Sequence, residues 1–168
     1  MITKFEKLNK SQKDDILPVL FDIYYGNMSR ICPRVKPYDV EREEWINEVS
    51  PALDKNPRQI ILMYQGDDLA GFVMYYTRDD LLMIEELQLK EKYQRTLLLH
   101  RLFTYLTELL SSGCARIEAF ASEKNYRSLD LMKYLGFCTI GKNEKYNLFH
   151  LCAKASDVTS KIKTKNSL

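Results

Sequence analysis

The alternation of hydrophobic residues between positions 58 and 121 limits the fold more than any other feature of the chain. Apolar residues first recur at every second position, as in half-buried strands. They then recur at the spacing of an amphipathic helix before the strand pattern returns. A Gly-Asp pair separates the first two strands, which is typical of a β-hairpin. The pattern therefore predicts three strands, a long helix and a fourth strand, at residues 58–65, 69–77, 81–89, 94–112 and 115–121.

The remaining segments extend this pattern to an α/β fold. A strand, a helix and a strand over residues 81–121 are expected to form a right-handed parallel crossover. We predict a mixed, mostly antiparallel sheet of about seven strands with helices on both faces. Further strands are expected at residues 2–8, 137–140 and 146–153, helices at 11–26, 38–54 and 126–135, and a loop at 27–37.

The length of the chain fits one domain. A chain of 168 residues buries enough surface to fold without disulfides or metals. We predict a single domain over residues 1–154. In residues 155–168 three lysines outnumber the single acidic residue Asp157, so this segment is predicted to be a mobile basic tail.

Composition argues against several classes of protein. The net charge is only +2, which gives no support to nucleic-acid binding. No apolar run approaches the ~20 residues of a membrane span, and the N-terminus has no apolar signal core, so we expect a cytoplasmic protein. The cysteines form no CxxC pair and no histidine lies at a ligand spacing, so no metal site is expected. We interpret the four cysteines as small buried hydrophobes: Cys32, Cys114, Cys138 and Cys152.

A polar turn follows the strand at residues 81–89 and suggests an anion site. Main-chain N–H groups at a helix N-terminus bind anions such as phosphates. Three leucines follow where such a turn would prefer glycine, and the alternative is a turn that merely starts an amphipathic helix. The polar residues of the turn are Lys92, Gln94, Arg95 and Thr96.

Together with a second stretch, this turn resembles the GNAT N-acetyltransferase superfamily. The family pattern is Glu-Leu-x-Val at a strand end, an aromatic residue, and then Gln/Arg-x-x-Gly-x-Gly/Ala. The segment 86–89, Tyr93 and Gln94 match this pattern, whereas the two glycine places hold Leu97 and Leu99. Arg95 also stands where the family often has glycine.

The second stretch is NYRSLDLMKYLGF, at residues 125–137. The family pattern begins with asparagine, has a small residue three places on and a tyrosine seven places on, and ends in Leu-Gly-Phe. Asn125, Ser128 and the segment 135–137 match it, but Met132 occupies the tyrosine place. Methionine cannot protonate a departing thiolate, so water would have to do so.

The resemblance implies a GNAT-like fold and acetyl-CoA as co-substrate. In the family, amides at the helix start bind the coenzyme's diphosphate, and strand backbone groups bind its pantetheine arm. A backbone N–H of the strand can also polarise the thioester carbonyl. The resemblance assigns the coenzyme contacts to Leu87, Leu89, Lys92, Gln94, Arg95, Thr96, Leu97, Asn125 and Ser128.

The resemblance also implies transfer of an acetyl group to a primary amine, which attacks the thioester directly. Glu86, and after it Glu85, are the candidates for the general base. The two side chains are expected on opposite faces of the strand, and either could instead be a solvated carboxylate. The acceptor pocket is expected to use Tyr24, Tyr25, Glu41, Glu44 and Trp45, a set that suits a cationic amine and equally suits an ordinary helix packed on a sheet.

The departures at Leu97, Leu99 and Met132 leave a second hypothesis open. A GNAT-like module could bind a ligand or a partner protein without turnover. The resemblance is also compatible with a homodimer. The two histidines, His100 and His150, are interpreted as a surface residue and a hydrogen-bonded structural residue.

Overall fold

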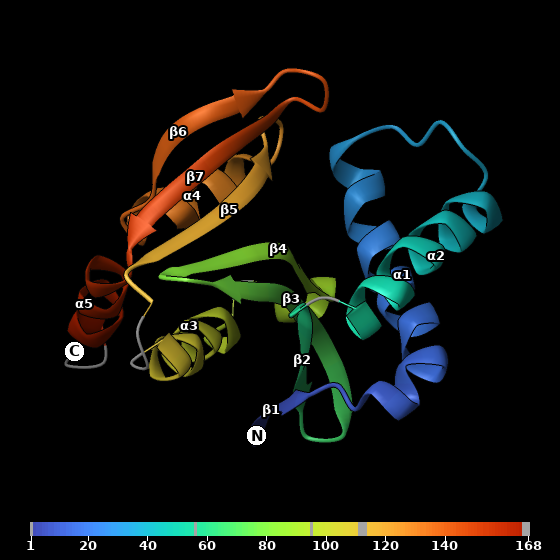
Figure 1. Ribbon diagram of the computed structural model, residues 1–168, viewed down its shortest axis with the longest axis horizontal. Coiled ribbons are helices and arrows are strands. Elements are labelled where there is room, and N and C mark those ends of the chain that lie inside the picture. The colour runs from blue at the N-terminus through green and yellow to red at the C-terminus, as the bar shows by residue number, and fades with distance from the viewer. Residues whose placement is uncertain (1, 56, 95, 111–113, 166–168) are drawn as a thin grey trace. The chain divides into compact units, whose positions relative to one another are not determined.

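The computed structural model describes residues 2–55, 57–94, 96–110 and 114–165. Over these residues seven strands form a sheet in the order β1-β2-β3-β4-β5-β7-β6 (Figure 1). β4 pairs with β5 in parallel, whereas the pairs β1–β2, β2–β3, β5–β7 and β6–β7 are antiparallel, which confirms the predicted mixed sheet. The strands are β1 (Thr3–Lys7), β2 (Gln59–Gln65), β3 (Asp68–Arg78), β4 (Leu81–Leu89), β5 (Arg116–Ser122), β6 (Cys138–Asn143) and β7 (Leu148–Lys154).

Five α-helices accompany the strands within the described ranges. None of them is long and apolar enough to cross a membrane. Two short 3-10 helices, η1 (Lys10–Gln12) and η2 (Glu91–Tyr93), precede α1 and α3. The α-helices are α1 (Lys13–Ile31), α2 (Tyr38–Lys55), α3 (Leu98–Leu110), α4 (Tyr126–Tyr134) and α5 (Ala155–Lys165).

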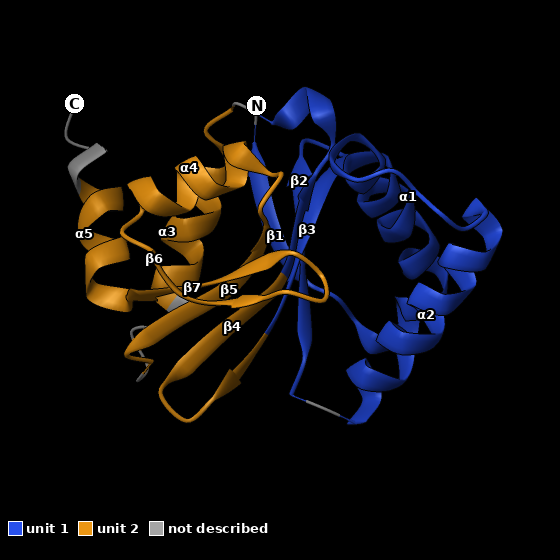
Figure 2. Cartoon of the chain, turned by 90° about the horizontal axis from the view of Figure 1, so that it is seen from above, with its two compact units in different colours: residues 1–75, 86–95 blue, residues 76–85, 96–168 orange. Residues whose placement is uncertain are grey.

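The chain divides into two compact units, each built from segments that are distant in the sequence (Figure 2). Unit 1 comprises residues 1–75 and 86–95, and unit 2 comprises residues 76–85 and 96–168. Both β3 and β4 begin in one unit and end in the other. The predicted single domain over residues 1–154 stays a prediction.

Unit 1 has a core between α1, α2 and strands β2 and β3. Leu17, Leu20 and Phe21 of α1 are fully buried, as is Phe72 of β3. The predicted hairpin is confirmed: β2 and β3 are joined by a two-residue turn whose Gly66 has φ +61°. The prediction of a loop from residue 27 is wrong for residues 27–31, because α1 continues to Ile31.

Unit 2 has a core lined by α3. Its predicted amphipathic pattern agrees with the burial of Leu98, Leu102, Phe103 and Leu106. The helix begins at Leu98 rather than at residue 94, because residues 91–93 form η2 and Gln94 is extended. The C-cap expected at residue 113 lies outside the described residues.

The predicted mobile tail is wrong for residues 155–165, which form α5. Val158 and Ile162 lie one helical turn apart and are buried, so one face of α5 belongs to the core of unit 2. α5 packs against α3, where Nε2 of His100 lies 3.1 Å from the carbonyl oxygen of Ile162. The prediction of a mobile tail was based on its lysines, whereas the burial of Val158 and Ile162 determines its structure.

Candidate functional site

The turn between β4 and α3 is held by hydrogen bonds within unit 1. The side-chain nitrogen of Gln94 donates to Oδ1 of Asn27 and to the carbonyl oxygen of Leu89, both at 3.0 Å. The backbone N–H of Gln94 donates to the carbonyl oxygen of Glu91. An amide group has two N–H donors, so all three donors of Gln94 are engaged. Gln94 therefore positions the turn, and in this structure none of its N–H groups is left for the expected contact with a phosphate.

Asn27 is the partner that the sequence did not reveal. Its side-chain nitrogen donates to Oε1 of Gln88 and to the carbonyl oxygen of Leu89, both at 2.9 Å. Backbone groups of Leu89 were expected to bind pantetheine, and in this structure its carbonyl oxygen accepts two hydrogen bonds from the protein. The available signal was position: Asn27 continues the stripe of Leu20 and Ile23 on α1.

A second cluster in unit 1 holds the lysines of the turn. The carboxylate of Asp68 accepts from Nζ of Lys90 at 2.8 Å, from Nζ of Lys92 at 2.6 Å and from the hydroxyl of Tyr93 at 2.8 Å. These three donors lower the pKa of Asp68 well below its usual range. Asp68 also raises the pKa of Lys92. Lys92, expected to face a diphosphate, is thus paired with a carboxylate.

The leucines at the N-terminus of α3 differ in their exposure. Leu98 is 2% exposed and belongs to the core, whereas Leu97 is 61% exposed. Oγ1 of Thr96 accepts from the backbone N–H of Leu98 at 3.2 Å, so Thr96 satisfies the first amide of the helix. Helix geometry directs the remaining amides of the first turn outward, toward acceptors beyond the helix. Arg95 lies outside the described residues.

Glu86 belongs to the Asn27 cluster of unit 1. Its Oε2 accepts from the side-chain nitrogen of Gln88 at 2.9 Å. Burial, followed by the charge of Glu86, raises the pKa of Tyr24. The charge of Glu86 therefore favours the protonated form of the Tyr24 hydroxyl. Glu85 is half-buried and is the last residue of β4 that belongs to unit 2.

An aromatic pocket of about 390 Å³ lies between α1, α2 and the loop that joins them. Phe21, Tyr24 and Trp45 form its wall, and the rings of Tyr24 and Trp45 are stacked with centroids 5.9 Å apart. Four of the five residues expected in the acceptor pocket line this pocket. Tyr25 does not line it but contacts the same loop through the guanidinium of Arg34.

Charged side chains surround this aromatic wall. Arg34 lies over the ring of Tyr24 at 5.8 Å and pairs with Glu41. Nζ of Lys36 pairs with Glu44 at 2.7 Å, and Glu48 contributes a third carboxylate. A cation of the protein thus already uses the ring and the acid that a cationic substrate would use. Arg34 could not be predicted from the sequence, because a lone arginine in a proline-containing loop carries no pattern.

The NYRSLDLMKYLGF stretch of unit 2 forms a capped helix, as predicted. Oδ1 of Asn125 accepts from the backbone N–H of Ser128 at 3.2 Å. At the other end Gly136 adopts φ +95°, and the N–H of Phe137 donates to the carbonyl oxygen of Met132 at 2.9 Å. This is a Schellman motif, which explains the glycine at this position.

Met132, at the family's tyrosine place, is a core residue. It is 4% exposed, whereas Tyr134 on the same helix is 51% exposed. The two side chains therefore point to different sides of α4, as expected from helical geometry. Tyr134 cannot take over the place of a tyrosine at 132.

The two histidines both make hydrogen bonds in unit 2. Nε2 of His150 lies 2.8 Å from Oε2 of Glu118, which is 7% exposed. The ring of His150 stacks on Phe120 at 4.5 Å. This confirms the prediction of a hydrogen-bonded His150. His100 is half-buried against α5 rather than a surface residue.

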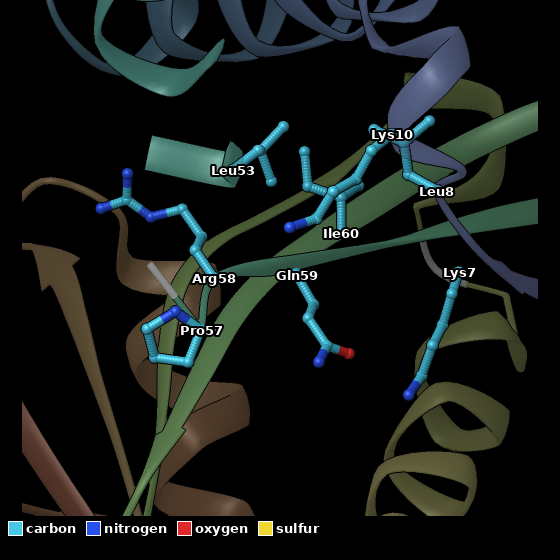
Figure 3. A pocket seen from close by; sticks show the side chains of 8 residues that line it. All are labelled: Lys7, Leu8, Lys10, Leu53, Pro57, Arg58, Gln59 and Ile60. Carbon is cyan, nitrogen blue, oxygen red and sulfur yellow. The ribbon is translucent and has the colours of Figure 1, made fainter. Parts of the chain in front are cut away.

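A second pocket of unit 1, of about 230 Å³, lies where β1 and β2 meet the end of α2. Lys7, Lys10 and Arg58 line it together with apolar residues. Figure 3 shows the side chains of Lys7 and Arg58 pointing away from each other, so their charges do not converge on one ligand. We assign no function to this pocket.

Comparison with known proteins places this geometry in a family. The model of the acetyltransferase (GNAT) family matches residues 18–137. A search of curated proteins finds no match to the chain.

Solved structures share the fold at low sequence identity. The chain is similar to the PaiA N-acetyltransferase from Thermoplasma acidophilum in complex with coenzyme A, with 14% identity, a TM-score of 0.71, and coverage of 92% of this chain and 99% of that chain. It is similar to an acetyltransferase from Thermus thermophilus, with 14% identity, a TM-score of 0.71 and coverage of 92% and 97%. It is also similar to the ribosomal-protein-S18-alanine N-acetyltransferase from Escherichia coli, with 14% identity, a TM-score of 0.66 and coverage of 92% and 94%.

Proposed function

The chain belongs to the acetyltransferase (GNAT) family, and from that premise we propose that it transfers an acetyl group from acetyl-CoA to a primary amine. The family match over residues 18–137, more than half of the 168 residues, carries this proposal. The neutral amine attacks the thioester carbonyl directly, and the thiolate of coenzyme A leaves.

The amides at the start of α3 are our candidates for binding the phosphate end of the coenzyme. The first turn of α3 presents the amides of Leu99 and His100 beyond the amide that Thr96 caps. The exposed side chain of Leu97 stands beside them, so the diphosphate has to approach past it. Arg95 is the candidate for direct charge, because Lys92 is paired with Asp68 and the donors of Gln94 are engaged.

The other coenzyme contacts are proposed from the family pattern. Asn125 uses Oδ1 to cap α4, and its amide nitrogen is the group we assign to the coenzyme arm, next to the hydroxyl of Ser128. Leu87 and the N–H of Leu89 are assigned to pantetheine through backbone groups. The carbonyl of Leu89 is left out, since Asn27 and Gln94 both donate to it.

On the acceptor side, we assign amine recognition to the aromatic pocket of unit 1. Trp45 and the carboxylate of Glu48 suit a cationic amine, which would have to displace Arg34 to reach the ring of Tyr24 and Lys36 to reach Glu44. Glu86 is our candidate for the base that removes the amine proton, through water or directly. Met132 cannot protonate the leaving thiolate. Water can do so, because a thiol has a usual pKa near ~8.5 and its thiolate is an acceptable leaving group.

Coenzyme binding is tested by thermal melting with acetyl-CoA and, as a phosphate-free control, S-acetylpantetheine. A ligand at about 100 times its dissociation constant stabilises the protein by ~2.7 kcal/mol. We expect acetyl-CoA to raise the Tm and S-acetylpantetheine to have a much smaller effect. Equal effects of the two compounds would contradict binding of the diphosphate by α3. No effect of millimolar acetyl-CoA would contradict coenzyme binding altogether.

Turnover is tested by thiol release from acetyl-CoA over a panel of diamines, aromatic amines and peptides. Glu86→Gln and Glu85→Gln form a matched pair, since both keep the shape of the side chain and remove one charge. We expect Glu86→Gln to lower kcat/KM by ~10²–10⁴-fold, the usual worth of a general base, and Glu85→Gln to lower it far less. The reverse result would move the assignment to Glu85.

A binding module without turnover is the second candidate. The engaged donors of Gln94, the pairing of Lys92 and the buried Met132 favour it. A rise in Tm with acetyl-CoA, combined with no thiol release on any amine of the panel, would support this candidate over the transferase.

A further inference from the structure

Cys138 and Cys152 lie directly opposite each other on neighbouring strands of unit 2. They are register partners in the antiparallel pair β6–β7. The Sγ atom of Cys138 lies 3.4 Å from the carbonyl oxygen of Cys152, so the Cys138 side chain is turned toward β7. Side chains at directly opposite positions of an antiparallel pair share one face of the sheet. The two thiols therefore face the same side.

The backbone geometry of this pair suits a covalent bond between the sulfurs. Directly opposite residues in antiparallel strands have Cα atoms about 4.5–5.5 Å apart, within the range of about 4.4–6.8 Å found in disulfides. β6 is the last strand in the sheet order, and its register shifts between Thr139 and Gly141, directly after Cys138. An edge strand with an irregularity can adjust its twist to bring the Cβ atoms closer.

The two thiols differ in access, which sets an order of reaction. Cys138 is exposed and Cys152 is half-buried, so the interpretation of the cysteines as buried hydrophobes is wrong. Burial, followed by the charge of Glu118 and then by Cys138, raises the pKa of the Cys152 thiol, while Arg116 opposes this shift. The thiolate is the reactive form of cysteine. Cys138 is thus the first nucleophile and Cys152 the resolving thiol.

We propose that Cys138 and Cys152 are a modification site that forms a reversible disulfide with a low-molecular-weight disulfide as oxidant. The Cys138 thiolate attacks one sulfur of the oxidant, forms a mixed disulfide and releases one thiolate. The Cys152 sulfur, after losing its proton to water, attacks the Cys138 sulfur and expels the second thiolate. The two cysteines lose two electrons and two protons, and the oxidant becomes two thiols. The bond ties the edge strand to β7 two residues from His150.

The test uses the full chain and glutathione disulfide as the probe, after complete reduction and removal of the reductant. Tryptic digestion without reduction separates Cys138, in peptide 134–142, from Cys152, in peptide 146–154. We expect these peptides to be joined and two of the four thiols to be lost, with all four restored by dithiothreitol.

Three variants provide the matched comparison. The Cys32→Ser/Cys114→Ser double variant is expected to form the same linked peptide, because it keeps the pair. Cys138→Ser and Cys152→Ser are each expected to form none. The proposal is overturned if Cys138 carries a glutathione adduct without linkage to Cys152. It is also overturned if Cys138 or Cys152 is linked to Cys32, Cys114 or another molecule. The wild-type peptide map alone decides the question if a variant fails to fold.

Discussion

Asn27 makes three hydrogen bonds that join α1 to β4 and to the turn before α3. Replacement by leucine keeps the approximate shape of the side chain but leaves Gln88, Gln94 and the carbonyl of Leu89 each without one partner. Since Gln88 is buried, we expect Asn27→Leu to lower the free energy of unfolding by about 2–3 kcal/mol. Urea unfolding followed by the fluorescence of Trp45, the single tryptophan, measures this change.

Ser29→Ala is the control for this variant. It also removes a side-chain hydrogen bond of α1, to the carbonyl oxygen of Tyr25, but at an exposed position. Its effect is expected to stay within about 0.5 kcal/mol. Equal effects of Asn27→Leu and Ser29→Ala would show that the Asn27 cluster contributes nothing beyond an ordinary surface hydrogen bond.

Asp68 provides a prediction about pH. Hydrogen bonds from Lys90, Lys92 and Tyr93 hold its pKa below the usual value in the folded protein. The unfolded chain then binds the proton more tightly, so the stabilisation is present above the usual pKa of about 3.9 and fades as the pH falls below it. Asp68→Asn should lower the urea midpoint at neutral pH, and its difference from wild type should narrow below about pH 4.

Asp67→Asn is the neighbouring control, at an exposed position of the same turn. It is expected to leave the urea midpoint nearly unchanged at both pH values. A loss of stability by Asp68→Asn that is the same at neutral and acid pH would contradict the electrostatic origin.

The residue types of the turn predicted that it is rich in hydrogen-bond donors, but not which acceptors these donors bind. Lysine and glutamine after a strand suggest anion binding, yet here Lys92 pairs with Asp68 and Gln94 donates to Asn27. Both partners are distant in sequence, and Asn27 was assigned to a loop. A side chain with several donors can serve a ligand or its own fold, and only the partners decide between the two.

At the scale of elements, the packing of β3 against β4 depends on Gly71. A Cβ atom at this position would lie 2.1 Å from the carbonyl oxygen of Gln88 and 2.9 Å from Cα of Leu89. Both are backbone atoms, so the strands would have to move apart. We expect Gly71→Ala to lower the free energy of unfolding by about 3 kcal/mol or more, seen as a large drop in Tm.

Gly26→Ala is the matched control, because it makes the same chemical change within α1. Apart from the adjoining residues and the backbone of the same helix, no heavy atom of the described structure lies within 4 Å of its added Cβ. Alanine favours helix over glycine by about 0.5–1 kcal/mol, so the Tm should rise. A similar drop in Tm for both variants would mean that the close approach at Gly71 is not the cause.

Elements with their own periodicity were predicted within a few residues, and those defined by tertiary packing were not. The hairpin of β2 and β3, the crossover from β4 to β5 and the capped α4 follow from local patterns. The last turn of α1 and the whole of α5 were missed. Two apolar residues in α5, Val158 and Ile162, are too few to form a pattern, and their burial comes from packing in unit 2.

At the scale of the molecule, the two units are linked by the course of the chain itself. The backbone passes between them after residues 75, 85 and 95, and both β3 and β4 contain one of these points. Unit 1 thus includes residues 86–89 of a strand whose first half belongs to unit 2. Neither unit is a continuous segment, so neither can be completed by synthesis of one half of the chain.

This arrangement predicts that the two units unfold together. Loss of either unit would free the half of β3 and the half of β4 that belong to it, while the other halves of the same strands stay folded. Two sets of probes separate the units: Trp45, the single tryptophan, lies in unit 1, and the two histidines, His100 and His150, lie in unit 2. We expect urea unfolding curves from Trp45 fluorescence and from the histidine proton resonances to share one midpoint. Two separate midpoints would show that the continuity of β3 and β4 does not couple the units, and that each unit holds its own strands.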